Sequence, residues 1–94
     1  MNIFDVELSK QAMHDLRKVP SYIAQKLQAW IHHIAYYELH ETRRVSGYHD
    51  EQLKGERFGQ RSIRLNRSYR AIYQIDKEGS VEIICVLEVN KHDY

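Results

Sequence analysis

Two arginines on neighbouring predicted strands are the side chains best placed for chemistry. Arg64 lies in the segment 60–66, where it alternates with apolar residues. Arg70 lies in the segment 69–75 and alternates in the same way. A short turn joins the segments, so we expect both guanidinium groups close together on one face of a β-hairpin. Like charges repel there unless an anion lies between them, which favours a phosphate ligand; the alternative is that acids such as Glu82 or Glu88 neutralise them.

The C-terminal sequence adds a candidate acid or base. His92 is the best candidate by residue type, because an imidazole changes its protonation near neutral pH. Tyr94 can stack on a nucleobase, or donate a proton where nearby cations favour its ionised form. Both residues follow the predicted strand 81–89, which we expect beside the arginines. The alternative is a frayed terminus without a role.

The positive charge of the chain is concentrated in one segment. The net charge of the 94 residues is +1, but residues 43–70 carry eight Lys or Arg against three acids, which gives +5. Seven of the eight are arginines, whose planar guanidinium groups suit phosphate oxygens. This favours a phosphate-contacting surface; the alternative is a solvated strand face with a few ion pairs. The eight residues are Arg43, Arg44, Lys54, Arg57, Arg61, Arg64, Arg67 and Arg70.

Length and composition indicate one domain that spans residues 1–94. The hydrophobic fraction of 43% is ordinary for a globular chain and argues against disorder. The single cysteine, Cys85, excludes an internal disulfide framework and a cysteine-based zinc site, and it favours the reducing cytoplasm. We expect neither a signal peptide nor a membrane span. Because His32 and His33 are adjacent on a predicted helix, they cannot share a metal ion, and we expect no metal and no cofactor.

The hydrophobic pattern predicts the order strand, helix, helix, strand, strand, strand. Ser9 is the expected N-cap of the first helix, which ends near Val19 because a proline disfavours helix in the preceding residue. Pro20 opens the second and longest helix. The loop 41–59 is long for so small a domain, and long ordered loops are more often functional than incidental. The predicted strands are 2–8, 60–66, 69–75 and 81–89, and the second helix is 20–40.

This order predicts an α+β fold, in which two N-terminal helices pack on one face of a small, mostly antiparallel four-stranded sheet. The helices should cover the apolar sets of the strands and leave the opposite face, with Arg64 and Arg70, open. Cys85 would then be a small buried hydrophobic residue and not a nucleophile. The residues expected on the covered face are Phe4, Val6, Ile63, Leu65, Ala71, Tyr73, Ile83, Cys85 and Leu87.

The chain resembles the RelE/ParE superfamily of toxins from bacterial type II toxin–antitoxin systems. The resemblance covers the whole predicted architecture and is sharpest from Leu53 to Tyr94. It is carried by Leu53-Lys54-Gly55, the Arg-Ser-Ile-Arg-Leu strand, the Tyr-Arg-x-x-Tyr strand and the terminal His-x-Tyr. The Leu53-Lys54-Gly55 motif and the Ser-Ile-Arg of the strand that follows are similar to the HigB-like branch. The His-x-Tyr ending is similar to that of the YoeB-like branch. Together the motifs are fairly specific, whereas each one alone is weak.

The resemblance implies an endoribonuclease that cuts messenger RNA in the ribosomal 30S A site and that an antitoxin holds inactive. The implied chemistry is metal-free: the ribose 2′-OH attacks the adjacent phosphorus and expels the 5′-oxygen, which leaves a 2′,3′-cyclic phosphate. Catalytic roles are carried over to Arg64, Arg70, His92 and Tyr94. Glu51 is the candidate counterpart of the glutamate of the YoeB-like branch. RNA contacts are expected from Lys54, Arg57, Arg61, Arg67 and Lys91.

Three points stay open at this level. Ser62 stands where RelE proper has a lysine, so the general base is not assigned, and His92 fits either the base or the acid. A ParE-like toxin that poisons DNA gyrase would share the fold but lack ribonuclease chemistry; the paired arginines and the His-x-Tyr ending weigh against it. A catalytically inactive toxin-like binding module is the third alternative. The open face and the +5 segment predict an acidic, partly disordered antitoxin that folds on binding.

Overall fold

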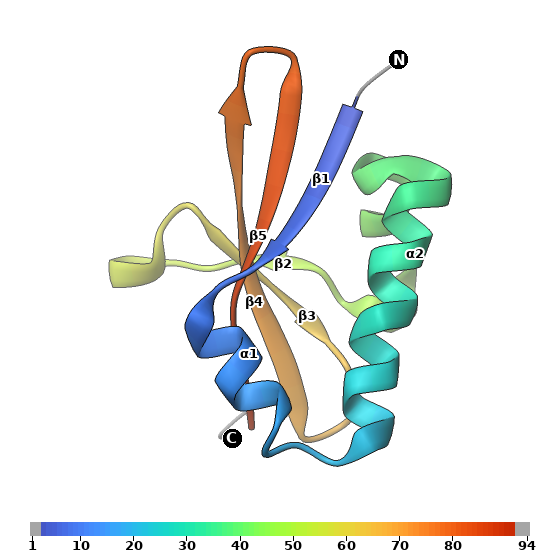
Figure 1. Cartoon of the computed structure of the whole chain (residues 1–94), viewed down its shortest axis with the longest axis vertical. Helices are drawn as coiled ribbons and strands as arrows, with labels where there is room; N and C mark the ends of the chain where they lie inside the picture. The colour runs from blue at the N-terminus through green and yellow to red at the C-terminus, as the bar shows by residue number, and fades with distance from the viewer. Residues whose placement is uncertain (1–2, 92–94) are drawn as a thin grey trace.

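The computed structural model describes residues 3–91 as two α-helices and a five-stranded mixed sheet (Figure 1). The strands are ordered β1-β5-β4-β3-β2 across the sheet. β1 pairs with β5 in parallel, and the three other pairings are antiparallel. The elements are β1 (Ile3–Leu8), α1 (Lys10–Leu16), α2 (Ser21–Arg43), the 3₁₀ turn η1 (Ser46–Tyr48), β2 (Glu51–Gln52), the 3₁₀ turn η2 (Gly55–Arg57), β3 (Gln60–Arg64), β4 (Tyr69–Glu78) and β5 (Val81–Lys91).

The predicted α+β class is confirmed, but the expected strand number is wrong. The structure adds β2, a strand of two residues inside the segment that was expected to be a loop. Glu51 pairs with Ser62 and Gln52 with Arg61, so β2 extends the sheet beyond β3. A pair of residues is too short to show alternation, which is why the hydrophobic pattern does not reveal it.

Local sequence signals account for most of the helix ends. The Ser9 hydroxyl accepts a hydrogen bond from the backbone N–H of Ala12 and donates one to the Leu87 carbonyl, which ties the start of α1 to β5. α1 ends at Leu16, earlier than expected, and α2 continues to Arg43. The helical path of α2 is interrupted at Glu38, whose φ of 69° lies in the left-handed region. None of the helices described in residues 3–91 is long and apolar enough to cross a membrane.

The core lies between the two helices and one face of the sheet. Trp30 of α2 is fully buried, and its ring packs on that of Tyr73 in β4 with 5.0 Å between the centroids. Burial of this apolar set is the main force that holds the fold together, because the described chain has no disulfide. The buried hydrophobic cluster comprises Ala12, Ile23, Leu27, Trp30, Ile34, Leu39, Ile63, Leu65, Ala71, Tyr73, Ile84, Val86 and Val89.

The faces of β3 and β4 are as predicted, but the face predicted for β5 is wrong. Ile84 and Val86 point into the core, whereas Cys85 lies on the other face and is only partly buried. Both sets of alternate residues in β5 are apolar, so alternation cannot decide between them. A shift in the register between β4 and β5 at Ile72 and Tyr73 then brings Val89 back to the covered face.

The face opposite the helices is partly covered by the segment that contains η2. The Arg57 guanidinium donates to Gln60 on β3 at 2.9 Å and to Glu88 on β5 at 2.8 Å, so its side chain crosses β4. Ile72, which pairs between Ser62 and Glu88 on this face, is fully buried. The expectation of a fully open face therefore fails in the middle of the sheet, where Arg57 covers Ile72. Figure 1 shows the turn between β4 and β5 at the far, upper end of the sheet.

Candidate active site

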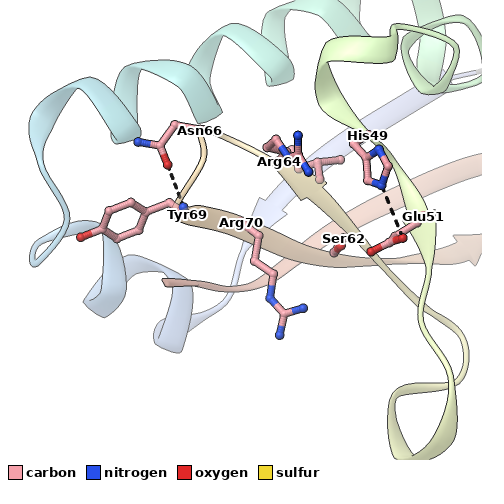
Figure 2. Close-up of a pocket in the computed structure, with 8 residues that line it drawn as sticks. His49, Glu51, Ser62, Arg64, Asn66, Tyr69 and Arg70 are labelled. Atoms are coloured by element: carbon pink, nitrogen blue, oxygen red, sulfur yellow. Dashed lines mark hydrogen bonds and ion pairs between the residues drawn. The ribbon is translucent and has the colours of Figure 1, made fainter. Parts of the chain in front are cut away.

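A hollow of about 190 Å³ opens at the end of the β3–β4 hairpin, on the side away from the core. Figure 2 shows that Arg70 comes from β4, Arg64 and Ser62 from β3, His49 from the loop that leads into β2, and Glu51 from the first position of β2. The hollow therefore combines the two predicted arginines with part of the long loop. Its lining residues are His49, Glu51, Ser62, Ile63, Arg64, Asn66, Tyr69 and Arg70.

Arg64 and Arg70 lie directly opposite each other in the antiparallel pairing of β3 with β4, as the sequence predicts. Within residues 3–91 neither of them forms an ion pair with a carboxylate. Cross-strand neighbours are roughly 4.5–5.5 Å apart at their Cβ atoms, so the two side chains start side by side, and Figure 2 shows their guanidinium groups turned in different directions. Such a pair favours an anion with several oxygens, because each guanidinium can donate to it in a fork.

The turn between the strands sets this register. The Asn66 side-chain oxygen accepts hydrogen bonds from the backbone N–H groups of Ser68 at 2.8 Å and Tyr69 at 2.7 Å. The backbone N–H of Leu65 donates to the Tyr69 carbonyl at 2.9 Å and closes the hairpin. An asparagine that bonds to its own turn in this way fixes where the second strand begins. The turn at Asn66 therefore places Arg70 opposite Arg64.

Arg70 is oriented by a chain of polar side chains along β5. Its Nε donates to the Asn90 side chain at 3.3 Å, and the Asn90 amide donates to Glu88. Glu88 also accepts a hydrogen bond from Arg57 and forms an ion pair with it. The alternative that Glu88 neutralises the two arginines directly is therefore not what the structure shows: it reaches Arg70 only through Asn90. Within residues 3–91 no hydrogen bond or ion pair is formed by the two outer nitrogens of Arg70.

Two titratable side chains of the loop reach the hollow. The Nε2 of His49 lies 3.7 Å from a carboxylate oxygen of Glu51, and both side chains are about half exposed. His49 adopts a left-handed backbone conformation, with φ 45° and ψ 50°. In the sequence these two residues carry no periodic signal, because they lie in an irregular loop. The resemblance to the YoeB-like branch is what pointed to Glu51.

The intervening residue, Asp50, anchors this loop to the covered side of the sheet. Its side chain is 1% exposed and accepts hydrogen bonds from Arg61 Nε at 2.6 Å and from the Tyr73 hydroxyl at 2.5 Å. Burial, and then the hydrogen bond and charge of Asp50, raise the pKa of Tyr73 to about 12. Burial alone would lower the pKa of Arg61, but the hydrogen bond and charge of Asp50 raise it above its ordinary value. The anchor fixes the backbone from which His49 and Glu51 project.

The remaining predicted site residues that the structure describes do not line this hollow. Lys54 is exposed at the start of η2 and does not line it. Arg57 and Arg61 are held in ion pairs with Glu88 and Asp50. The Lys91 ammonium lies 5.9 Å from the ring centre of Tyr69, which does line the hollow.

Arg67 lines a second, neighbouring hollow. The predicted catalytic residues His92 and Tyr94 lie outside the described residues. No cluster of three or more His, Cys, Asp or Glu that could hold a metal ion occurs within the part of the chain that the structure describes.

Comparisons with known proteins bear on both the sequence and the fold. A family model described as the ParE toxin of the type II toxin–antitoxin system parDE matches residues 6–93. A search of curated proteins finds no match.

Among solved structures, the chain is similar to a YoeB/ParE toxin from Agrobacterium tumefaciens, with 18% identity, a TM-score of 0.69 and coverage of 95% of this chain and 99% of that one. It is similar to YafQ from E. coli strain BL21(DE3), with 17% identity, a TM-score of 0.73 and coverage of 94% and 92%. It is also similar to the toxin–antitoxin complex RelBE2 from Mycobacterium tuberculosis, with 24% identity, a TM-score of 0.58 and coverage of 96% and 99%. At these identities the solved structures support the fold.

Proposed function

The chain belongs to the ParE toxin family of type II toxin–antitoxin systems, and we propose that it is an endoribonuclease that cuts messenger RNA. The observation that carries this proposal is the hollow in which Arg64 and Arg70 lie side by side next to Glu51 and His49. Cleavage of RNA by its own 2′-hydroxyl needs a base, an acid and cations that stabilise the phosphorane. The hollow brings two cations and two proton-transfer side chains within reach of one phosphate.

In the proposed reaction, Glu51 removes the proton of the ribose 2′-hydroxyl, and the oxygen forms a bond to the adjacent phosphorus. The bond between phosphorus and the 5′-oxygen then breaks, and that oxygen leaves with the electron pair and takes a proton from an acid. The products are a 2′,3′-cyclic phosphate and a 5′-hydroxyl. Arg64 and Arg70 offset the charge that grows on the phosphoryl oxygens, in the way of preorganised donors.

The acid is assigned on sequence. His92 follows Lys91, the last residue of β5, and Lys91 pairs with Tyr69 at the rim of the hollow. We assign to His92 the proton that the 5′-oxygen takes, and to Tyr94 the positioning of that proton. His49, whose Nε2 lies 3.7 Å from a carboxylate oxygen of Glu51, holds the carboxylate in place.

The substrate and the partner follow from the same resemblance. We place the messenger RNA in the ribosomal 30S A site, with its backbone in contact with Lys54, Arg67 and Lys91. The similar RelBE2 structure is a complex of a toxin with its antitoxin, and for this chain we propose an acidic, partly disordered antitoxin. Its negative charge would neutralise the basic segment and close the hollow.

The test is cleavage of a message by translating ribosomes to which the purified chain is added. Wild-type protein should cut the message, and Glu51→Gln should cut it about 10²–10⁴-fold more slowly, the usual contribution of a proton-transfer group. Glu41→Gln is the matched control, because Glu41 is an exposed carboxylate whose ion pair with Arg44 lies outside the hollow. An intact message in the presence of folded wild-type protein would overturn the proposal.

A second candidate function is that of a DNA gyrase poison. The observation that favours it is the match to a model of ParE toxins over almost the whole chain. A gyrase poison would leave the message intact and trap gyrase on linearised DNA. The same protein sample added to gyrase and supercoiled DNA therefore separates the two functions, and activity in neither assay would indicate an inactive binding module.

A further inference from the structure

A second hollow, of about 480 Å³, adjoins the candidate active site. It lies between the first half of α2, the segment that contains η1, and the turn between β3 and β4. Arg64 and Asn66 line both hollows, so the two hollows adjoin at these residues. Its lining residues are Lys26, Ala29, Val45, Gly47, Tyr48, Arg64, Leu65, Asn66 and Arg67.

The lining combines positive charge with an apolar and aromatic floor. Lys26, Arg64 and Arg67 supply cations, and no carboxylate occurs among the described residues that line this hollow. Val45, Leu65 and the Tyr48 ring supply the apolar surface. An apolar floor with an aromatic ring and a cationic rim suits a flat heterocycle that carries a phosphate, because the ring stacks while the cations meet the phosphate.

The Tyr48 ring is held in place by its neighbours. It meets the His33 ring edge-on, with 6.0 Å between the centroids and an angle of 81°. His33 is fixed in turn by a 2.8 Å hydrogen bond between its Nδ1 and the Thr42 hydroxyl, and the same hydroxyl donates to the Glu38 carbonyl. Since Thr42 is buried, this support is part of the folded core. A ring that is ordered before binding loses little conformational entropy when a base stacks on it.

We propose that the second hollow is a nucleoside subsite, which takes the base of a nucleotide next to the scissile phosphate of single-stranded RNA. The proposal rests on the proposed ribonuclease function, because the scissile phosphate defines the neighbouring position. Arg64 then contacts the phosphate between the two hollows, and Tyr48 contacts the base. Lys26 meets the phosphate on the far side of that base.

RNA is favoured over an acidic peptide because the two hollows adjoin at Arg64. A peptide would need only the positive charge, whereas the Tyr48 side chain and the shared Arg64 match the repeat of base and phosphate in one strand. An acidic segment of the antitoxin is the competing occupant, and the experiment separates the two.

The test measures binding of the full-length wild-type chain to a six-nucleotide RNA whose 2′-hydroxyls are methylated, so that the strand cannot be cut. Two further RNAs lack the base on one or the other side of the central phosphate. Loss of the base that enters the subsite should weaken binding about 5- to 100-fold, the size expected for one base stacked on an aromatic ring. The base at the other side should matter less.

The variants Tyr48→Ala and Lys26→Ala should each weaken binding of the intact RNA. In Tyr48→Ala the difference between the intact RNA and the sensitive abasic RNA should also largely disappear. The matched controls are Tyr36→Ala, which removes a tyrosine of α2 that is 82% exposed and lies outside both hollows, and Lys10→Ala on α1. The abasic RNAs test the subsite on unaltered protein, so the answer does not depend on the folding of a variant.

The outcomes separate the subsite from the function. Binding of the intact RNA that does not change when either base is removed would overturn the subsite and leave the proposed function standing. No binding of the intact RNA to the folded chain would count against both. If Tyr48→Ala and Lys26→Ala bound RNA normally but bound the antitoxin more weakly, the hollow would be a peptide site and the proposal would be wrong.

Discussion

The Asp50 carboxylate and the Tyr73 hydroxyl are joined by a 2.5 Å hydrogen bond that links the loop of the candidate site to the centre of the sheet. Tyr73 is fully buried and packs on Trp30, so it cannot move without disturbing the core. The other oxygen of Asp50 is bound by Arg61. His49 and Glu51, on either side of Asp50, therefore project from a backbone that the core itself holds.

We expect Asp50→Asn to slow cleavage while RNA binding is largely kept. The amide retains the shape of the carboxylate but loses the charged hydrogen bonds, which should lower the free energy of unfolding by about 1–3 kcal/mol. Because the loop is then held less firmly, Glu51 should spend less time in the position from which it removes a proton. Chemical denaturation, the binding constant for uncut RNA and kcat measure these three effects separately.

Glu41→Gln controls for the loss of one negative charge, since Glu41 lies on the surface of α2. If Asp50→Asn were destabilised by this amount and still cut RNA at the wild-type rate, Asp50 would be purely structural.

The buried Tyr73 makes stability depend on alkaline pH. Its pKa is about 12 in the folded chain and about 10 when the chain is unfolded, because burial and Asp50 disfavour the phenolate. Below pH 10 the hydroxyl is protonated in both states, and its contribution to stability is complete. As the pH rises from 10 to 12 only the unfolded chain loses the proton, so the free energy of unfolding should fall by about 2–3 kcal/mol.

Urea denaturation at several pH values between 9 and 12 measures this effect. Tyr73→Phe is the control, because it lacks the titrating hydroxyl and should lose less stability over the same range. Equal pH dependence in the two proteins would mean that other groups account for the alkaline loss.

The sequence predicted the parts of this structure that local periodicity determines. Alternation in 60–66 and 69–75 placed Ile63 and Ala71 on the covered face and Arg64 and Arg70 opposite them, because one side of each segment is apolar and the other side is mostly polar. The covered face of β5 was missed because both of its sides are apolar, and there the two neighbouring strands decide.

The loop part of the site has no such signal. Glu51 and His49 reach the hollow because Asp50, between them, binds Arg61 and Tyr73. These contacts join residues that are 11 and 23 positions apart in the chain. Neither spacing nor hydrophobic pattern reports long-range hydrogen bonds of this kind. Arg61, expected at the RNA surface, is committed to this anchor for the same reason.

We expect Arg70→Ala to lower the cleavage rate about 10²–10³-fold, which is the usual effect of removing one donor to a transition state. Arg70→Lys should restore only part of the rate, because an ammonium group cannot donate in a fork. Among the described residues the side chain is bound through Asn90 alone, so stability should change little. Single-turnover cleavage of a ribosome-bound message gives the rates, and thermal denaturation gives the stability.

Arg17→Ala is the matched control, because Arg17 is an exposed arginine at the end of α1 that lines neither hollow. A folded Arg70→Ala protein that kept the full cleavage rate would make Arg70 an ordinary surface residue.

The last prediction concerns the residues beyond β5. If His92 donates the proton to the 5′-oxygen and Tyr94 positions it, a chain that ends at Lys91 should cut about 10²–10⁴-fold more slowly, the range for a proton-transfer group. Stability should be preserved, because β5 is complete and its last pair, Lys91 with Tyr69, is retained. His92→Gln should reproduce most of the loss within the full-length chain. A leaving group that needs no protonation discriminates further: an RNA whose 5′-oxygen at the cleaved bond is replaced by sulfur should be cut at similar rates by the wild-type and the shortened chain. Wild-type rates on ordinary RNA from the chain that ends at Lys91 would contradict the assignment and leave His49, beside Glu51, as the acid.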